Sequence, residues 1–285
     1  MLDNARSRLI ICNKSIAYGD YMKNSVRERE ILNLLADRDQ VSVSELAEHL
    51  GVSEATVRRD LQTMEEQGLL QRIHGGATRV GIGRHEPFFQ DKMAQNRQAK
   101  ESIARKALEL IEENDHIYLD GGSTVLCLAR LLDQFRSLTI VTNSLMVAAE
   151  LMETTHDLIL VGGQFRSLSR TLVGPLTQPI IEALHVDKAF MGTMGFTAED
   201  GMTTTDFNEA FTKERIMERA GQVVLLADSS KLGKTSFVRS GRAADVDILI
   251  TDKVPSEEFM EAMRRVHVKV ILAGAEQRDS ILHEI

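Results

Sequence analysis

The chain has 285 residues, 43% of them hydrophobic and 27% charged, which are the proportions of an ordinary globular protein of about two domains. No apolar run is long enough to span a bilayer, and residues 1–24 lack the apolar core of a signal peptide, so neither a membrane protein nor a secreted one is expected. With two cysteines, a disulfide framework is not expected and a cytoplasmic protein is. The cysteines and the eight histidines show no metal-ligand spacing, so no metal or cofactor is expected.

The net charge of −8 is unevenly distributed along the chain. Residues 86–285 carry 22 Lys and Arg against 30 Asp and Glu, which accounts for the whole −8. An acidic second half would repel DNA and confine any nucleic-acid contact to a local basic patch. Residues 1–21 show no usable periodicity, and we expect either a disordered arm or a segment upstream of a start at Met22.

Residues 22–80 have the pattern of a winged helix-turn-helix domain. An apolar stripe predicts a first helix over residues 26–36. Ser42 and Glu45 have the spacing of a capping box, so a second helix should begin there. Gly51 should end that helix, because glycine adopts a left-handed conformation that other residues resist.

The third predicted helix has one apolar face and one polar face. Ser53 is its expected N-cap, and its apolar face has spacings of four and three residues in Val57, Leu61 and Met64. The opposite face carries Thr56, Arg58, Arg59, Gln62 and Thr63. Such a helix presents hydrogen-bond donors at the width of the DNA major groove. The alternative is a small helical hairpin whose arginines are merely solvated.

A basic hairpin is predicted after this helix. Residues 67–85 contain no Asp or Glu and carry three arginines, Arg72, Arg79 and Arg84. Gly75-Gly76 supplies the turn between two short strands, which places Arg72 and His74 near the tip. A hairpin of this kind is a wing that can grip phosphate or enter the minor groove.

Residues 81–98 change composition and are expected to be a linker, and residues 99–285 alternate between apolar strands and helices. The predicted strands are residues 116–120, 138–143, 157–162, 188–194, 223–228, 247–251 and 268–272. The predicted helices are residues 100–111, 124–133, 144–153, 175–184, 208–220 and 256–266. Most strands are continuous apolar runs, as expected where both faces of a parallel sheet are covered. The fold class is therefore α/β, with a mainly parallel sheet.

Polar residues gather where these strands end. Ligands of such sheets bind in the loops at the carboxyl edge. After the first strand, Gly122 allows close backbone approach, while Ser123 and Thr124 offer hydroxyls at the start of a helix, which together could cradle a phosphate. A simple glycine turn is the alternative. Asp120 would repel phosphate, so it is assigned to ligand hydroxyls or to holding the loop.

Two lysines could neutralise a bound anion. Lys213 lies on a predicted helix and could equally be a solvated helix residue, while Lys231 follows a strand end close to Asp228. The stretch from Asp228 to Thr235 nearly spells a nucleotide-binding P-loop, but Asp stands where Gly is required and a carboxylate opposes phosphate there. Hydrolysis of ATP or GTP is therefore not expected.

Specific motifs add a family resemblance. The run from Ser53 to Leu61, S-x-x-T-x-R-R-D-L, followed by GLLQRIHGGA, resembles the DNA-binding domain of DeoR-family bacterial transcription regulators. EPFFQDK, LDGGST, IVTNS, LVGG, VDKAFMGTMGF with DGMTTTD, and LADSSK are similar to the effector domain of that family, which resembles ribose-5-phosphate isomerase. The resemblance implies a phosphorylated sugar or polyol bound through Asp120, Gly122, Ser123, Thr124, Asn143, Lys213, Asp228 and Lys231.

The function predicted from these patterns is regulation of transcription. Double-stranded operator DNA would be contacted through Ser53, Thr56, Arg58, Arg59, Gln62, Arg72 and His74. The resemblance implies repression or activation of a sugar or polyol catabolic operon, and of the two we expect repression that is relieved by the effector. A homodimer or homotetramer is expected, since paired helix-turn-helix units read repeated half-sites. The rival hypothesis is a sugar-phosphate isomerase carrying a DNA-binding appendage, for which Asp120, Asp228 and Glu209 are the available acids.

Overall fold

The computed structural model describes residues 26–35, 38, 40–73, 75–78, 86–87 and 89–274. The chain divides between His85 and Glu86 into two compact units. The expected arm over residues 1–21 lies outside the described residues. None of the described helices combines the length and the apolar character that a membrane crossing requires.

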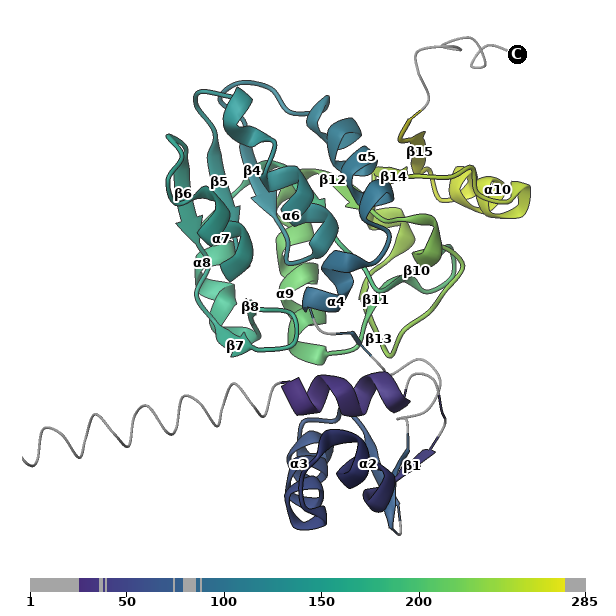
Figure 1. Cartoon of the computed structure of the whole chain (residues 1–285). Coiled ribbons are helices and arrows are strands. Elements are labelled where there is room, and N and C mark those ends of the chain that lie inside the picture. Colours follow the sequence, from purple (N-terminus) through teal and green to yellow (C-terminus); the bar gives the residue numbers. More distant parts are fainter. Residues whose placement is uncertain are drawn as a thin grey trace, which may run out of the picture. The chain divides into compact units, whose positions relative to one another are not determined.

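In its described residues, the first unit contains three helices and a small antiparallel sheet (Figure 1). A helix over residues 26–35 precedes β1 (Gln40–Ser42), α2 (Val43–Leu50) and α3 (Glu54–Glu66). β2 (Gln71–Ile73) and β3 (Gly76–Thr78) form a hairpin, and β1 pairs with β3 to give the order β1-β3-β2. The core is apolar and includes Ile31, Leu35, Leu46, Leu61 and Met64.

The ends of α2 and α3 confirm the predicted caps. The Ser42 hydroxyl accepts a hydrogen bond from the Glu45 backbone N–H at 3.2 Å, and the Glu45 carboxylate accepts one from the Ser42 N–H at 2.9 Å, which completes the capping box. Gly51 has φ 63° and ends α2. The Ser53 hydroxyl accepts from the Thr56 N–H at 3.2 Å and begins α3. Local sequence therefore sets the turn between the two helices.

One ion pair is built into this small core. Asp60 on α3 is buried, and its carboxylate accepts two hydrogen bonds from Arg27, from Nε at 2.7 Å and from Nη2 at 3.1 Å. Because a buried carboxylate is costly without a partner, this pair ties α3 to the helix over residues 26–35. Sequence reasoning did not predict it.

The second unit is built on a parallel sheet of seven strands in the order β15-β14-β12-β9-β4-β5-β6. Each neighbouring pair is parallel. All seven predicted strands are confirmed, with shifted ends: β4 (His116–Leu119), β5 (Thr139–Thr142), β6 (Asp157–Leu160), β9 (Val186–Met191), β12 (Ala220–Leu226), β14 (Ile248–Thr251) and β15 (Lys269–Leu272).

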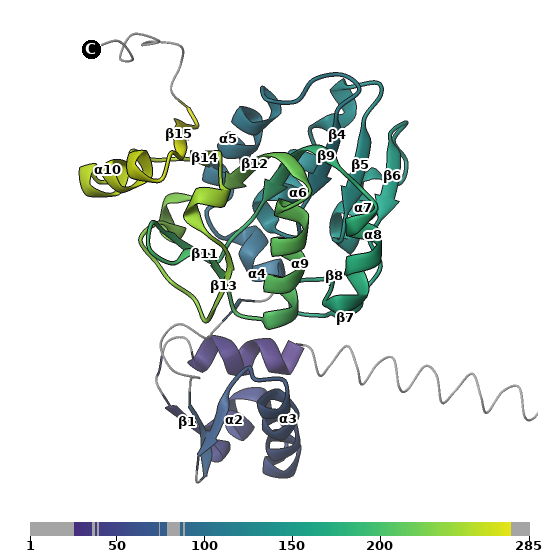
Figure 2. The same cartoon turned by 180° about the vertical axis from the view of Figure 1, so that it is seen from behind.

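Helices cover both faces of this sheet (Figures 1 and 2). One core packs α4 (Phe89–Ala94), α5 (Arg97–Leu108), α6 (Ser123–Ala129) and α7 (Leu145–Leu151) against one set of strand side chains. The other core packs α8 (Gln178–Glu182), α9 (Phe207–Met217) and α10 (Glu257–Arg265) against the alternate set. Ile117 and Leu119 lie in the first core and Tyr118 in the second, as the strand period of two requires.

Shorter elements were not predicted from the sequence. β7 (Gln164–Arg166) and β8 (Thr171–Val173) form a hairpin, and β10 (Gly195–Thr197), β11 (Gly201–Thr204) and β13 (Val238–Gly241) form a second small sheet. Single turns of 3-10 helix occur at η1 (Leu132–Gln134), η2 (Pro175–Thr177), η3 (Ser229–Lys231) and η4 (Ala243–Asp245). Helix α4 lies inside the stretch expected as a linker, and Phe89 is buried in the first core, so residues from Glu86 onward are part of the second unit.

Candidate effector pocket and DNA-binding face

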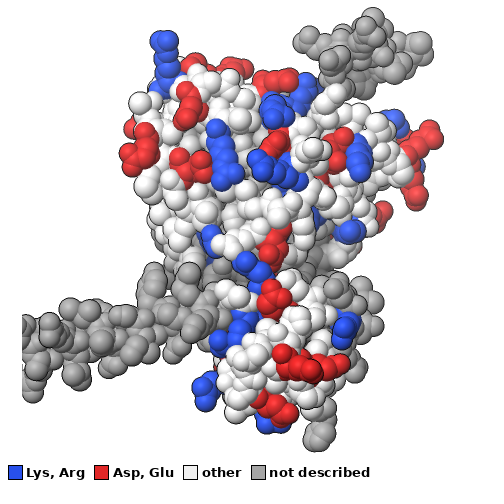
Figure 3. Space-filling view, viewed as in Figure 1, with Lys and Arg blue, Asp and Glu red and all other residues white. Residues whose placement is uncertain are grey.

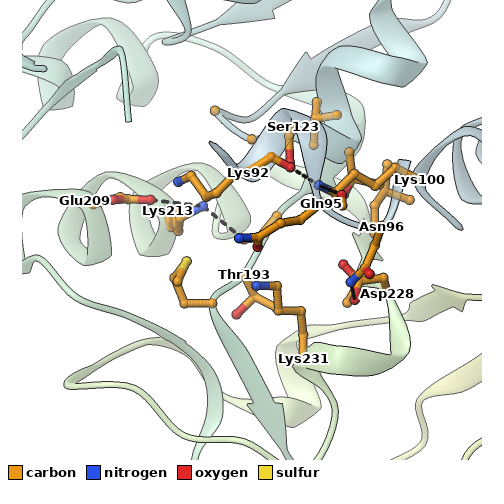
Figure 4. A pocket seen from close by; sticks show the side chains of 18 residues that line it. Lys92, Gln95, Asn96, Lys100, Ser123, Thr193, Glu209, Lys213, Asp228 and Lys231 are labelled. Atoms are coloured by element: carbon orange, nitrogen blue, oxygen red, sulfur yellow. Dashed lines mark hydrogen bonds and ion pairs between the residues drawn. The ribbon is translucent and has the colours of Figure 1, made fainter. Parts of the chain in front are cut away.

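A pocket opens at the carboxyl edge of the parallel sheet. Its walls come from the loops after β4, β9 and β12, from α9, and from the segment that joins α4 to α5 (Figure 4). Six of the eight expected effector residues line it: Gly122, Ser123, Thr124, Lys213, Asp228 and Lys231. Strand-end loops that are far apart in sequence thus meet around one hollow.

Lys213 is buried, with 2% of its surface exposed, so the solvated alternative for this residue is wrong. Its amine forms an ion pair with Asp120, lies 3.8 Å from a Glu209 oxygen and donates a hydrogen bond to the Gly192 carbonyl at 3.0 Å. Burial lowers the pKa of Lys213, but Asp120 and Glu209 outweigh burial and raise it overall. Lys213 therefore stays charged inside the protein and holds the loop after β9.

Two expected effector residues do not line the pocket. Asp120 is buried behind it, where its carboxylate also accepts a hydrogen bond from the Gly192 N–H at 2.9 Å. Asp120 thus holds the loop after β9, and its expected contact with ligand hydroxyls stays a prediction. Asn143 donates a hydrogen bond to the Leu172 carbonyl at 3.0 Å, and its side-chain oxygen is buried without a hydrogen-bond partner among the described residues.

Besides Lys213, three lysines line the pocket, and the sequence had indicated only Lys231 among them. Lys92 and Lys100 come from the stretch around α4 and from α5, and both line the pocket. Burial lowers the pKa of Lys100 and of Lys231, and Asp228 opposes this for both. Lys100 donates to the backbone carbonyls of Lys92 and Gln95. No hydrogen bond or ion pair holds the Lys231 amine within the described parts of the chain.

The opposite walls of the pocket have different chemistry (Figure 4). On one side Lys213 and Glu209 lie together, and on the other the Asn96 amide donates to Asp228 at 3.0 Å and to the Ser230 hydroxyl at 3.3 Å. Asn96 has φ 50°, a left-handed conformation that asparagine tolerates better than most residues. Asn96 thereby ties the start of α5 to the strand-edge loop that carries Lys231.

A chain of buried and partly buried charges connects two residues of the pocket wall, Lys92 and Glu209. Glu86 lies 2.7 Å from the Lys92 amine and 2.7 Å from the Arg166 guanidinium, and it also accepts a hydrogen bond from the Thr205 hydroxyl. Burial raises the pKa of Glu86, but Lys92 and Arg166 outweigh burial and lower it to about 2. Arg166 continues the chain to Glu209, with 3.2 Å between Nη1 and a carboxylate oxygen.

Glu209 lines the pocket and has a raised pKa, first because of burial and then because of the nearby charge of Glu86. A carboxyl of this kind can act as a hydrogen-bond donor or as a proton acceptor toward a bound hydroxyl. Among the described residues, no group of three or more His, Cys, Asp or Glu side chains could hold a metal ion.

The polar face of α3 is open to solvent. Arg58, Arg59 and Gln62 are exposed and Thr56 is half-buried. Arg58 forms an ion pair with Glu54 at 2.6 Å, whereas the Arg59 guanidinium has no hydrogen bond or ion pair within the described residues. Ser53 is exposed but its hydroxyl caps α3, so part of its expected DNA-contacting capacity is used inside the protein.

The β2–β3 hairpin was expected to be a wing, and the structure describes most of it. Arg72 on β2 is exposed, and its backbone N–H donates to the Glu65 carboxylate at 2.9 Å. Gly75 has φ 85°, as the predicted turn requires. His74, Arg79 and Arg84 lie outside the described residues. The visible face of this unit mixes acidic with basic side chains (Figure 3), so cationic groups are not segregated there.

Comparison with known proteins matches both units. A family model described as the DeoR-like helix-turn-helix domain matches residues 27–81, and a model described as the DeoR C terminal sensor domain matches residues 95–253. The chain is 39% identical over 86% of its length to the HTH-type transcriptional regulator GlpR of Haloferax volcanii, covering 96% of that protein. It is 34% identical over 88% of its length to the glycerol-3-phosphate regulon repressor of Escherichia coli, covering 100% of that protein.

Among solved structures, this chain has more distant similarity to two other kinds of protein. Ribose 5-phosphate isomerase A of Methanocaldococcus jannaschii matches with a TM-score of 0.37 and 18% identity, covering 48% of this chain and 55% of that one. A translation initiation factor eIF-2B of Pyrococcus horikoshii matches with the same TM-score over 51% of each chain.

Proposed function

The chain belongs to the DeoR family of helix-turn-helix transcription regulators, and from this premise we propose that it represses a sugar or polyol catabolic operon until a phosphorylated effector releases it. The observation that carries the proposal is the pocket at the carboxyl edge of the sheet. It sets three lysines, Lys92, Lys100 and Lys231, around the hydroxyls of Ser123 and Thr124. Amines and hydroxyls of this density suit a phosphorylated ligand.

The acidic and amide groups of the same pocket suit the rest of such a ligand. Glu209, Asn96 and Asp228 can exchange hydrogen bonds with the hydroxyls of a sugar or polyol. The names of related proteins point the same way, since one relative is a glycerol-3-phosphate regulon repressor and another a lactose phosphotransferase system repressor. We therefore assign the pocket to a small phosphorylated polyol or sugar.

A thermal-shift screen tests the effector half of the proposal. A ligand that binds only the folded protein raises its melting temperature with concentration, so phosphorylated sugars and polyols should do so and their unphosphorylated parents should not. Lys231→Met should weaken the shift, because it removes a pocket amine that no other described group holds. Lys253→Met, a change of the same kind outside the pocket, is the matched control. A panel without any shift would refute the effector assignment.

Operator titration tests the DNA half. We propose that the exposed face of α3 with Thr56, Arg58, Arg59 and Gln62 enters the major groove, with Ser53 at its start and Arg72 and His74 on the wing. Binding of fluorescent upstream DNA should weaken steeply as salt rises, since each phosphate contact releases counterions. Operator affinity that does not respond to salt would contradict contacts between the protein and DNA phosphates.

We also propose that two or four copies of the chain act together, so the complex with operator should contain more than one chain by mass photometry.

An isomerase remains the second candidate because Glu209 has a raised pKa and lines the pocket. We nevertheless propose that the chain is not an enzyme. Asp120, a candidate base by sequence, forms an ion pair with Lys213 and accepts a hydrogen bond from the Gly192 N–H. Asp228, on the wall opposite Glu209, accepts hydrogen bonds from the Asn96 amide and the Ser230 N–H, so the other two candidate acids already have partners inside the protein. Incubation with candidate sugar phosphates, followed by NMR, decides the question: conversion of aldose to ketose would establish the enzyme.

A further inference from the structure

Glu86 is the residue at which the second unit begins, and residues 79–85 connect it along the chain to the hairpin that ends the first unit. It is a carboxylate with only 3% of its surface exposed, although it precedes the first helix of its unit. Three groups from three separate places fix it: Lys92 on α4, Arg166 on β7 and Thr205 ahead of α9. The first residue of the second unit is thus fixed by ion pairs with Lys92 and Arg166.

Lys92 belongs to two environments at once. Its amine pairs with Glu86 at 2.7 Å, and the residue also lines the proposed effector pocket, with 14% of its side chain exposed. Glu86 itself does not line the pocket. A phosphate in the pocket therefore competes with Glu86 for the same ammonium group, because each charge-assisted hydrogen bond is stronger than a bond to a neutral acceptor.

Three other cations of the pocket and of the buried charge network have partners that do not depend on Glu86. Arg166 also lies near Asp206 at 3.6 Å and Glu209 at 3.2 Å, so it keeps carboxylate partners when Glu86 changes. Lys213 is held by Asp120 and the Gly192 carbonyl. Lys100 donates to two backbone carbonyls. Lys92 is the pocket lysine whose charged partner is the residue at the start of the unit.

We propose that Lys92 is shared between the phosphorylated effector and Glu86, so that effector binding loosens the ion pair that anchors the segment leading to the DNA-binding unit. The inference rests on the proposed function, and it names the contact through which the same pocket acts on the rest of the chain. An effector can shift the chain only through contacts that differ between its two states, and the Lys92–Glu86 pair is such a contact.

A double-mutant cycle with inorganic phosphate as the probe tests the competition in the full-length chain. Phosphate affinity is read from the rise of melting temperature with phosphate at constant ionic strength. Glu86→Gln should tighten phosphate binding, because Lys92 no longer pairs with a carboxylate, and Lys92→Met should weaken it, each by about tenfold. In the Lys92→Met background, Glu86→Gln should have no further effect. Glu101→Gln, which breaks the surface pairs with Arg97 and Arg105, is the matched control and should leave phosphate affinity unchanged.

Tightening by Glu86→Gln that is equal with and without Lys92 would overturn the proposal, since the carboxylate would then act by general repulsion. Unchanged phosphate affinity in Glu86→Gln would overturn it as well.

The second readout is the response of operator binding to the effector. The ratio of operator affinities without and with the phosphorylated compound chosen by the screen should approach one in Glu86→Gln, although this variant still binds the compound. A wild-type chain that binds operator but neither phosphate nor any phosphorylated compound refutes the proposed function itself. A wild-type chain that binds both, with a normal operator response in Glu86→Gln, refutes only the Lys92–Glu86 inference. If Glu86→Gln does not fold, Lys92→Arg takes its place: it keeps the cation, so it should preserve the operator response that Lys92→Met loses.

Discussion

At the scale of single residues, the same side chain type has different roles according to what surrounds it. Lys213 is buried and fixed by Asp120, so it supports the loop after β9, whereas Lys231 lines the same pocket without a hydrogen-bond partner among the described residues. Arg58 and Arg59 are neighbours on α3, yet Arg58 pairs with Glu54 and Arg59 does not pair with any described group. The unpaired member of each set is the one available to a ligand.

Arg59→Ala should therefore weaken operator binding by about 1–3 kcal/mol if Arg59 reads a base, and it should relax sequence preference at that position. Fluorescence anisotropy at several salt concentrations measures both effects. A guanidinium that contacts only phosphate would lower the salt slope by about one and weaken all sequences alike. Arg264→Ala removes an equal charge from an exposed pair on α10 and should leave operator affinity unchanged. Unchanged operator affinity of Arg59→Ala would contradict the proposal that the exposed face of α3 contacts DNA.

Glu86 predicts a pH dependence of stability. Its folded pKa of about 2 lies below the ordinary glutamate pKa of 4.5, so ionised Glu86 stabilises the fold above pH 4.5 and this contribution disappears as pH falls toward 2. Glu86→Gln removes the ionisation, and its free energy of unfolding should decline less steeply than that of the wild type across this window. Urea unfolding at a series of pH values measures the slopes. Parallel slopes for the two proteins would contradict the buried ion pairs of Glu86.

At the scale of elements, the loop between β4 and α6 contains a matched pair of glycines. A Cβ on Gly121 would lie 2.0 Å from the Thr171 methyl group, and Thr171 is buried with its hydroxyl 2.7 Å from that of Ser169. A Cβ on Gly122 would meet nothing within 4 Å, and its φ of 176° is ordinary extended backbone. One glycine is required for packing, and the other leaves space at the pocket.

Gly121→Ala should lower the free energy of unfolding by about 1–3 kcal/mol through overpacking, whereas Gly122→Ala should leave it nearly unchanged. Thr171→Ser in the Gly121→Ala background removes the clashing methyl group and should restore most of the loss. Chemical denaturation measures all four proteins. Gly122→Ala should instead weaken effector binding in the thermal-shift screen, since its methyl group occupies the proposed ligand space. Equal stability of the two alanine variants would contradict this packing.

Elements that carry their own signal were predictable, and those that depend on distant contacts were not. The seven sheet strands are apolar runs, and the Ser42 and Ser53 caps are local hydrogen bonds, so both follow from neighbouring residues. β7, β10 and β11 are three or four residues long and include glycine or polar side chains, as in GFT and GMTT. Their pairing needs partners elsewhere in the fold, so a local pattern cannot reveal them.

The same distinction explains the pocket. The strand-edge rule located five pocket residues, because all lie in the segments just after β4 and β12: Gly122, Ser123, Thr124, Asp228 and Lys231. The remaining polar side chains come from α4, from α5 and from the two residues between them, and the place of this segment over the sheet edge is set by tertiary packing: Lys92, Gln95, Asn96 and Lys100. The motif EPFFQDK contains both Glu86 and Lys92 and was a family signature in the sequence, yet nothing in its spacing shows that its two charges pair across a pocket wall.

At the scale of the whole molecule, charge is divided between the two halves of the chain. Residues 86–285 account for the net −8, while the groups proposed to contact DNA lie in the first unit. An acidic second unit disfavours non-specific attachment to DNA and leaves contact to the α3 face and wing. Regulation then requires only that the effector change the affinity of the first unit for operator.

Thermodynamic linkage turns that requirement into a measurable equality. If an effector weakens operator binding by some factor, saturating operator must weaken effector binding by the same factor, and couplings of this kind typically span about 5–150-fold. Effector affinity should therefore fall in the presence of operator duplex, measured by calorimetry with the compound selected in the screen. A scrambled duplex of equal length provides the control for charge and should have a smaller effect. Identical effector affinity with operator and with scrambled DNA would mean that the pocket and the α3 face are not coupled, and repression relieved by the effector would then be wrong for this chain.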